Sequence, residues 1–311
     1  MTVALYGYEL ASSHALHHGR SGPALRGRLR IELTDADLLQ GHGELIAWSE
    51  EPEGFAIFRV PDGLLVWCQA AGVYRIDADA GMITTSPRGA SDVWEHRLST
   101  TVLPLLLAER GDLALHAATV FDGPRAVAFC GTSGRGKSTL SAALGLSGHL
   151  VSAEDGTVLS DLDDRPLVWP GPIGVRVTAQ TWARLGGHHD RTAPLAKAVR
   201  RCAGDHLPVT APRALSSVIV LRERGGSRLE LRELDPPAAL RALVPNAIFA
   251  GPEALATTMH QVARIAERVP VLEARLPDDL DRVGAAAAEI LKAVPAGPQD
   301  AASVRMPQRA I

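Results

Sequence analysis

VAFCGTSGRGKSTLSAALGL, residues 127–146, determines how the rest of this chain is interpreted. Its apolar start predicts a short β-strand, and its alanine- and leucine-rich end predicts a helix. The turn between them matches the pattern G-x-x-x-x-G-K-[ST], whose fixed positions are Gly131, Gly136, Lys137 and Ser138. Strand, glycine-rich turn and helix follow each other in the order that this motif needs to form a phosphate-binding loop.

The chemistry of phosphate binding accounts for the residue types in the turn. Backbone N–H groups can surround an anion where glycines leave room, and the start of the helix adds partial positive charge. Lys137 can reach the β- and γ-phosphates of a nucleotide, and the Ser138 hydroxyl can coordinate Mg²⁺. The chain has only 3 lysines, so a lysine at the motif position argues against a chance match. The predicted nucleotide-binding residues are Gly131, Thr132, Ser133, Gly134, Arg135, Gly136, Lys137, Ser138 and Thr139.

Length and composition limit the class of protein. A chain of 311 residues is long enough for two domains, and 46% hydrophobic with 22% charged residues is typical of a folded protein. The net charge of −3 provides no basic field for nucleic acid. The 3 cysteines form no CxxC pair, which indicates a reducing compartment. Without a signal-peptide pattern or a membrane-length apolar run, we expect a cytoplasmic protein that does not bind membranes.

The chain divides into three predicted parts. Residues 1–92 alternate apolar and polar positions in short runs, which predicts a small β-rich N-terminal domain. Residues 93–294 mix helical and strand patterns, which predicts an α/β domain around the phosphate loop. Residues 295–311 are rich in proline, alanine and polar residues, which predicts a disordered tail.

Two acidic residues follow the strand that is predicted directly after the helix of the phosphate loop. The sequence predicts a strand over residues 149–153, and Glu154 and Asp155 come directly after it. Ligands of open α/β sheets bind at the carboxyl ends of the strands, so a carboxylate here could hold Mg²⁺ or accept a proton from a hydroxyl. A strand predicted over residues 113–121 carries His116 and forms a hairpin with the loop strand. A lone histidine in a strand is usually a core residue, so the sequence pattern alone does not identify His116 as a functional residue.

Other polar groups leave two interpretations open. The segment 186–209 is predicted to be a loop, and its basic residues fit either a solvated face or a mobile contact with phosphate or an acidic substrate. The histidines near the N-terminus predict a surface helix or a frayed end rather than a metal site. The residues in question are His14, His17 and His18 near the N-terminus, and His188, His189, Asp190, Lys197, Arg200 and Arg201 in the loop.

The combination of motifs resembles a known kinase family. Leu-His-Ala at residues 115–117, the phosphate loop, a short helix and then GHLVSAED at residues 148–155 are similar to the HPr kinase/phosphorylase family. The resemblance is closest to HPr-kinase-related proteins with a different N-terminal domain, some of which phosphorylate a serine of a natural-product precursor peptide, including lasso peptides. It extends over residues 94–290. Transporter-type ATPases fit less well, because no LSGGQ-like segment follows the loop.

The resemblance implies a fold and roles for individual residues. It implies a P-loop kinase core like the C-terminal domain of HPr kinase, with ATP and Mg²⁺ as cofactors. By this resemblance Glu154 is the general base, Asp155 holds Mg²⁺ together with Ser138, and His116 orients a carboxylate or phosphate. The family normally has Asp-Asp where this chain has Glu154 and Asp155, so which acid is the base stays open.

We therefore predict an α/β P-loop kinase that transfers the γ-phosphoryl group of ATP to a hydroxyl. The implied partner is a peptide or protein serine, with a natural-product precursor peptide among the candidates; a homo-oligomer is left open. The alternative is a nucleotide-dependent binding or regulatory module without phosphoryl transfer. The resemblance also leaves open phosphorolysis and a small-molecule hydroxyl acceptor.

Overall fold

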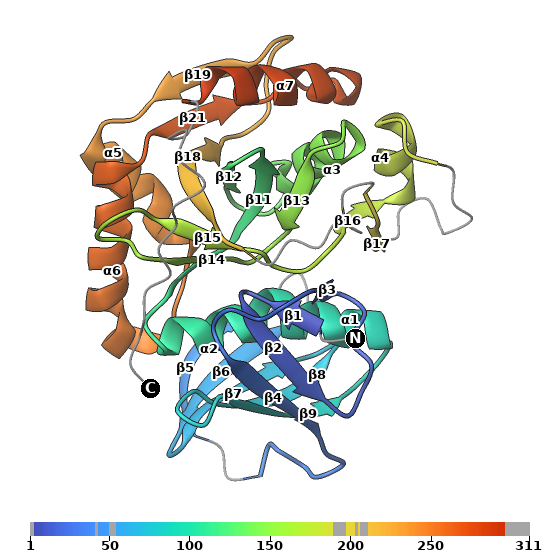
Figure 1. Cartoon of the computed structure of the whole chain (residues 1–311), viewed down its shortest axis with the longest axis vertical. Helices are drawn as coiled ribbons and strands as arrows, with labels where there is room; N and C mark the ends of the chain where they lie inside the picture. Colours follow the sequence, from blue (N-terminus) through green and yellow to red (C-terminus); the bar gives the residue numbers. More distant parts are fainter. Residues whose placement is uncertain are drawn as a thin grey trace.

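The computed structural model describes residues 3–40, 43–49, 54–188, 197–202, 205 and 211–295. Within these ranges the chain forms a mixed α/β structure with two large sheets and a short two-stranded one. Figure 1 shows the N-terminal sheet at one end of the molecule and the second sheet, with its helices, at the other. No helix in the described part of the chain is long and apolar enough to cross a membrane.

The N-terminal sheet is built by local pairing of alternating strands. In the described ranges it has nine strands in the order β3-β1-β2-β4-β9-β8-β7-β6-β5, and β5 to β9 form a run of antiparallel hairpins. Its strands are β1 (Val3–Leu5), β2 (Tyr8–Ser12), β3 (Arg20–Ser21), β4 (Arg28–Leu33), β5 (Glu44–Ser49), β6 (Phe55–Val60), β7 (Gly63–Cys68), β8 (Gly72–Asp77) and β9 (Met82–Pro87).

The second sheet contains the predicted phosphate-loop strand. It has ten described strands, of which β13-β11-β12-β18-β15-β14-β10-β20 follow one path, and β21 and β19 extend from β18. These are β10 (Leu113–Leu115), β11 (Ala117–Asp122), β12 (Arg125–Cys130), β13 (Leu150–Ala153), β14 (Thr157–Ser160), β15 (Leu167–Trp169), β18 (Arg213–Leu221), β19 (Glu230–Glu233), β20 (Ala247–Ile248) and β21 (Val271–Arg275). The separate pair is β16 (Val175–Thr178) and β17 (Lys197–Arg200).

Helices cover both faces of the second sheet. Val127 and Phe129 of β12 pack with residues of α3 and α7, whereas Ala128 and Cys130 pack with residues of α5 and α6. This alternation is the period of two that a strand buried on both faces requires. The helices here are α3 (Lys137–Leu146), α4 (Ala179–Arg184), α5 (Pro236–Leu243), η3 (Val244–Asn246), α6 (Gly251–Arg268), η4 (Leu280–Arg282) and α7 (Val283–Ala293).

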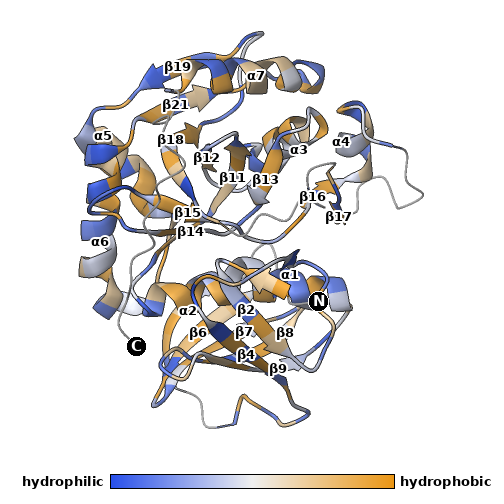
Figure 2. Ribbon diagram, viewed as in Figure 1, coloured by the Kyte–Doolittle hydropathy of each residue, from blue (hydrophilic) through white to orange (hydrophobic). Residues whose placement is uncertain are grey.

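A continuous helical segment lies between the two large sheets (Figure 1). It consists of α1 (Ser91–Arg97), a π-helical turn η1 (Leu98–Val102) and α2 (Leu103–Glu109). Its apolar residues belong to one buried cluster with the strands of the N-terminal sheet. Figure 2 shows the corresponding hydrophobic colouring along α2 and the strands next to it. The segment thus packs on the N-terminal sheet although it follows residue 92, and the domain boundary at that residue stays a prediction.

Buried polar contacts from the N-terminal sheet hold the end of β13. The Tyr6 hydroxyl lies 2.9 Å from the main-chain oxygens of both Ser99 and Gly156. Arg20, which is 2% exposed, donates from Nη2 to the Val151 oxygen at 2.6 Å and from Nε to the Gly171 oxygen at 3.0 Å. Buried hydrogen bonds of this kind are costly to break, so the strand that leads into Glu154 and Asp155 is fixed from outside its own sheet.

Most predicted elements are confirmed, with four corrections. The strand predicted over residues 113–121 is interrupted at His116, because β10 pairs with β14 and β20 while β11 pairs with β12 and β13. The alanine-rich pattern of residues 277–294 predicts a helix there, but the chain is α-helical only from Val283. His14, His17 and His18 lie on no helix, and His18 is buried, with its main-chain N–H bonded to the Glu95 carboxylate.

The fourth correction concerns the segment 186–209, predicted to be a loop. Residues Lys197–Arg200 form β17, which pairs antiparallel with β16, a partner distant in sequence that the local pattern could not reveal. Arg201 donates to the main-chain oxygen of His17 at 2.5 Å. His189 and Asp190 lie outside the described residues, as do residues 296–311 of the predicted disordered tail.

The close approach of η1 to the turn after Asp155 predicts a stability effect at Gly156. A Cβ atom there would lie 2.5 Å from the Thr100 main-chain oxygen, so Gly156→Ala should lower the free energy of unfolding by about 1–3 kcal/mol. Gly284→Ala is the control, because a Cβ atom at Gly284, in α7, would meet nothing within 4 Å. Thermal and urea unfolding measure both variants; equal stability for the two would contradict the close packing.

Candidate functional site

The direction of β11 brings the predicted site residues to one edge of the second sheet. β11 runs antiparallel to both β12 and β13, with Ala117 opposite Cys130 and Thr119 opposite Ala153. The start of β11 therefore lies beside the ends of its two neighbours. His116 precedes β11, the glycine loop (residues 131–136) follows β12, and the acid pair follows β13. Three segments distant in sequence thus converge.

The glycine loop has backbone angles that require glycine. Gly131, Gly134 and Gly136 have φ values of 143°, 83° and 101°, which lie in the left-handed region. Gly136 is the residue before α3, so its conformation turns the chain directly into the helix. The arrangement of strand, loop and helix predicted from the motif is therefore present, with the N–H groups at the start of α3 next to the loop.

Lys137 lies over its own loop. Its Nζ donates to the Gly131 oxygen at 2.7 Å and is 3.0 Å from His116 Nε2. The residue is 6% exposed, and this burial lowers the pKa of the ammonium group, although the nearby acids oppose the shift. The ammonium group is therefore held between the start of the glycine loop and His116.

His116 connects Lys137 to the acid pair. Its Nδ1 lies 3.3 Å from Asp155 Oδ1, while Nε2 faces the lysine. Burial lowers the pKa of this imidazole, with Lys137 acting in the same direction and Asp155 against it. A neutral ring that donates from Nδ1 and accepts at Nε2 satisfies both contacts. The resulting chain of polar groups runs from the glycine loop through His116 to Asp155.

Glu154 is the more deeply buried member of the acid pair. It is 5% exposed, and its Oε1 accepts a hydrogen bond of 2.6 Å from the Ser138 hydroxyl. Burial, together with the adjacent Asp155, raises the pKa of Glu154 to about 7, although the bond from Ser138 and the charge of Lys197 lower it. Ser138 and Glu154, predicted separately from the sequence, are thus in direct contact.

The remaining loop residues differ in exposure. Thr132, Ser133 and Gly134 are exposed, whereas Arg135 and Thr139 are partly buried. Arg135 pairs with Glu223 at 3.4 Å across the end of β18. The exposed loop residues therefore leave the outer face of the loop open to a ligand.

Asn246 is a site residue that the sequence analysis missed. Its side-chain oxygen accepts from the Gly131 N–H at 2.9 Å, and its main-chain oxygen accepts from the His116 N–H at 2.6 Å. Asn246 thus positions both the start of the glycine loop and the histidine. No local motif marks it, because it lies 115 residues downstream of Gly131, at the end of η3.

A cavity of about 700 Å³ opens beside the glycine loop on the side of β18. Gly131, Thr132 and Asn246 line it together with residues of β18, β19, β21 and α5. Its lining is rich in charge, with Arg222 and Arg232 both paired to Glu273. Since β12 lies between β18 and β11 in the sheet, the cavity and the acid pair are on opposite sides of the loop.

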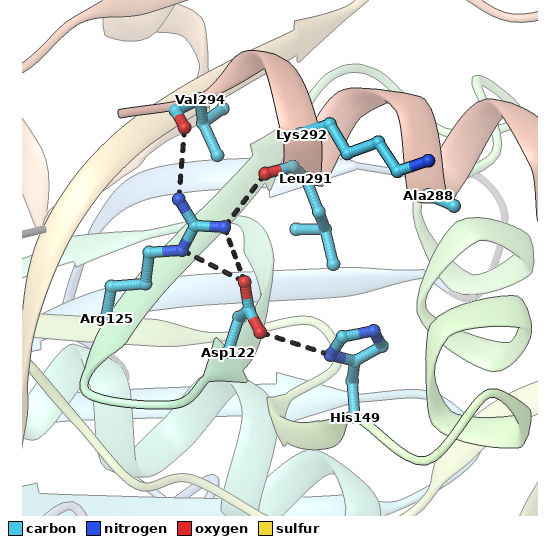
Figure 3. Close-up of a pocket in the computed structure, with 7 residues that line it drawn as sticks. All are labelled: Asp122, Arg125, His149, Ala288, Leu291, Lys292 and Val294. Atoms are coloured by element: carbon cyan, nitrogen blue, oxygen red, sulfur yellow. Dashed lines mark hydrogen bonds and ion pairs between the residues drawn. The ribbon is translucent and has the colours of Figure 1, made fainter. Parts of the chain in front are cut away.

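A second cavity of about 460 Å³ lies at the other end of β11 and β12 (Figure 3). Arg125 pairs there with Asp122 at 2.5 Å and donates to the main-chain oxygens of Leu291 and Val294. His149 lies 3.6 Å from the same aspartate. Because the arginine bonds to the end of α7, we assign this cluster a structural role.

No family model and no curated protein matches the chain. Among solved structures, the chain is similar to that of the Hpr(Ser) kinase/phosphatase from Coxiella burnetii. The identity is 13% and the TM-score 0.32, over 58% of this chain and 95% of that one. This is a distant structural likeness to a kinase/phosphatase and assigns the chain to no family, so function has to be argued from the site itself.

Asn246 provides a test of how the glycine loop is held. Asn246→Ala removes the acceptor of the buried Gly131 N–H and should lower the free energy of unfolding by about 1–3 kcal/mol. Both variants lose the bond from Asn246 Nδ2 to the Ala242 oxygen, but Asn246→Asp keeps an acceptor oxygen for Gly131 and should lose less stability. Urea unfolding of both variants compares them; if Asp is as destabilising as Ala, the bond to Gly131 does not stabilise the loop.

Proposed function

We propose that the protein is an ATP-dependent phosphotransferase that acts on the hydroxyl group of a serine in a peptide or protein. The observation that carries this proposal is the linked cluster beside the glycine loop: Lys137, His116 and Asp155 form one chain of polar contacts, and Ser138 bonds Glu154. Phosphoryl transfer depends mainly on positioning and charge stabilisation, which such a cluster provides.

The two sides of the glycine loop differ in chemistry, which supports a separate position for each of the two substrates. The cavity beside β18 is open and arginine-rich, and it suits the nucleoside end of ATP. The side of β13 holds the carboxylates, which suit an incoming hydroxyl. In this arrangement the γ-phosphate lies between the two, next to Lys137.

Each residue of the cluster has a role in the proposed reaction. Lys137 stabilises the charge that develops on the transferred phosphoryl group. Glu154 accepts the proton of the serine hydroxyl as the new O–P bond forms, and the bond to the β-phosphate oxygen breaks with its electron pair leaving on ADP. His116 orients Asp155. Ser138 and Asp155 are the oxygen ligands that would hold Mg²⁺, which would neutralise phosphate charge.

One observation favours a second candidate function. Glu154 is almost fully buried and already accepts a bond from Ser138, which restricts its access to an incoming hydroxyl. A module that binds nucleotide and docks a partner without phosphoryl transfer would need no accessible base. The serine acceptor of the first function is proposed to be a peptide, with a natural-product precursor among the candidates. A homo-oligomer is also left as a proposal.

Alanine substitutions of two lysines test nucleotide binding. Mg·ATP should raise the melting temperature of the wild type, because a ligand that binds only the folded state stabilises it. Lys137→Ala should abolish most of this shift, since the ammonium group is held at the start of the glycine loop. Lys292→Ala, on α7 beside the second cavity, is the matched control and should keep it. Equal shifts in the two variants would argue against phosphate binding at the loop.

Substitutions in the acid pair distinguish phosphoryl transfer from partner docking without transfer. With γ-labelled ATP and serine peptides, Glu154→Gln should reduce the transfer rate by about 10²–10⁴-fold while ATP affinity stays nearly unchanged. Asp155→Asn should instead raise the Mg²⁺ concentration that half-maximal rate requires. If the wild type binds ATP and a peptide but labels no candidate, the docking module is favoured; if the two variants show the opposite effects, their roles are exchanged.

A further inference from the structure

His96 faces the acid pair from a different part of the chain. It lies in the last turn of α1, is 7% exposed, and was not singled out by any sequence motif. One ligand atom from each of His96, Glu154 and Asp155 can be chosen so that all lie within 4.8 Å of one another. Glu154 is buried and Asp155 partly so, which makes this cluster an internal one rather than a group of surface acids.

The packing of the helical segment fixes His96 in this position. The hydroxyls of Ser99 and Thr100 donate to the His96 main-chain oxygen at 3.1 and 2.8 Å, in the π-helical turn that follows α1. Gly156 allows the same turn to approach the chain directly after the acid pair. π-helical turns inside helices are frequent at functional sites, and here the turn sets the spacing between the imidazole and the carboxylates.

The chemistry of the cluster suits a ligand that binds an imidazole nitrogen. Within the described residues, neither ring nitrogen of His96 takes part in a hydrogen bond or an ion pair, and its ring only meets His18 edge-on. Arg176 and Lys137 bring positive charge near the carboxylates. A divalent cation can use all three groups at once.

We propose that His96, Glu154 and Asp155 form a divalent-cation site that binds Mn²⁺ more tightly than Mg²⁺. Two carboxylates and a neutral imidazole match the charge of a divalent ion. Mg²⁺ prefers oxygen ligands, whereas imidazole nitrogen favours transition metals such as Mn²⁺, Co²⁺ and Zn²⁺. Three protein ligands leave further coordination positions for water or a phosphate oxygen. A carboxylate that binds the ion through one oxygen keeps the other as an acceptor.

This site shares Glu154 and Asp155 with the proposed function and deepens it, but it does not depend on nucleotide binding. The test therefore uses the full chain, stripped of metal and free of nucleotide, titrated with Mn²⁺ while the electron paramagnetic resonance signal of the free ion is followed. The wild type should bind one Mn²⁺, and Mg²⁺ should displace it only at more than tenfold higher concentration. His96→Gln should weaken Mn²⁺ binding at least tenfold, because it removes the nitrogen ligand.

His149→Gln is the matched control, since His149 also lies beside an aspartate, but at the opposite end of β11 (Figure 3). It should bind Mn²⁺ as the wild type does. Pulsed resonance of the bound ion should detect an imidazole nitrogen in the wild type and in His116→Gln, which removes the histidine that contacts Asp155. This readout needs no His96 variant and so decides the question even if His96→Gln fails to fold.

Three results would overturn the site: no Mn²⁺ binding by the wild type, bound Mn²⁺ without a nitrogen signal, or a folded His96→Gln that binds as tightly as His149→Gln. A nitrogen signal lost in His116→Gln would assign the imidazole ligand to His116 and equally reject His96. Failure of the nucleotide proposal shows separately, in the Lys137→Ala melting experiment, because the Mn²⁺ titration contains no ATP.

Discussion

The antiparallel direction of β11 is the constraint on which the candidate site depends. If β11 ran parallel to its neighbours, its start would lie at the far edge of the sheet, more than a strand length from the glycine loop. Because it runs against them, the residue before it meets the residues after β12 and β13. The short hairpin turn between β11 and β12 enforces this direction, since two adjacent strands joined by so few residues can pair only antiparallel.

The N-terminal sheet contributes to the same site through its contacts with β13. Arg20 bonds to main-chain oxygens along β13 and near Gly171, and Tyr6 joins the helical segment to Gly156. Both side chains are buried, so these bonds form in a medium where they are strong and their loss is costly. The placement of Glu154 and Asp155 is therefore a property of both sheets together, and removing the N-terminal part would leave the end of β13 without these supports.

The sequence was sufficient for the elements whose signals are local. The glycine loop, the acid pair and the alternating strands each carry their pattern within a few residues, and the structure has these elements close to the predicted positions. Three features could not be predicted because they depend on partners distant in sequence. His116 interrupts a continuous apolar run only because β10 and β11 pair with different strands. Residues 197–200 become a strand only when β16 is beside them. Asn246 acts through contacts that no nearby motif indicates.

The composition of the cluster itself argues for a ligand. Burying the Lys137 ammonium group, the Glu154 carboxylate and the His96 imidazole in one place costs free energy that well-packed apolar residues of similar volume would not. The rest of the junction between the sheets is filled with such apolar residues, among them Trp94, Leu98 and Val102. Apolar side chains could therefore fill the position of the cluster, but polar side chains occupy it. Lys137 bonds to the Gly131 oxygen and contacts His116, whereas the ring nitrogens of His96 have no hydrogen-bond or ion-pair partner within the described residues. A buried imidazole that the packing positions without a hydrogen-bond partner, beside two carboxylates, is what a cation site requires.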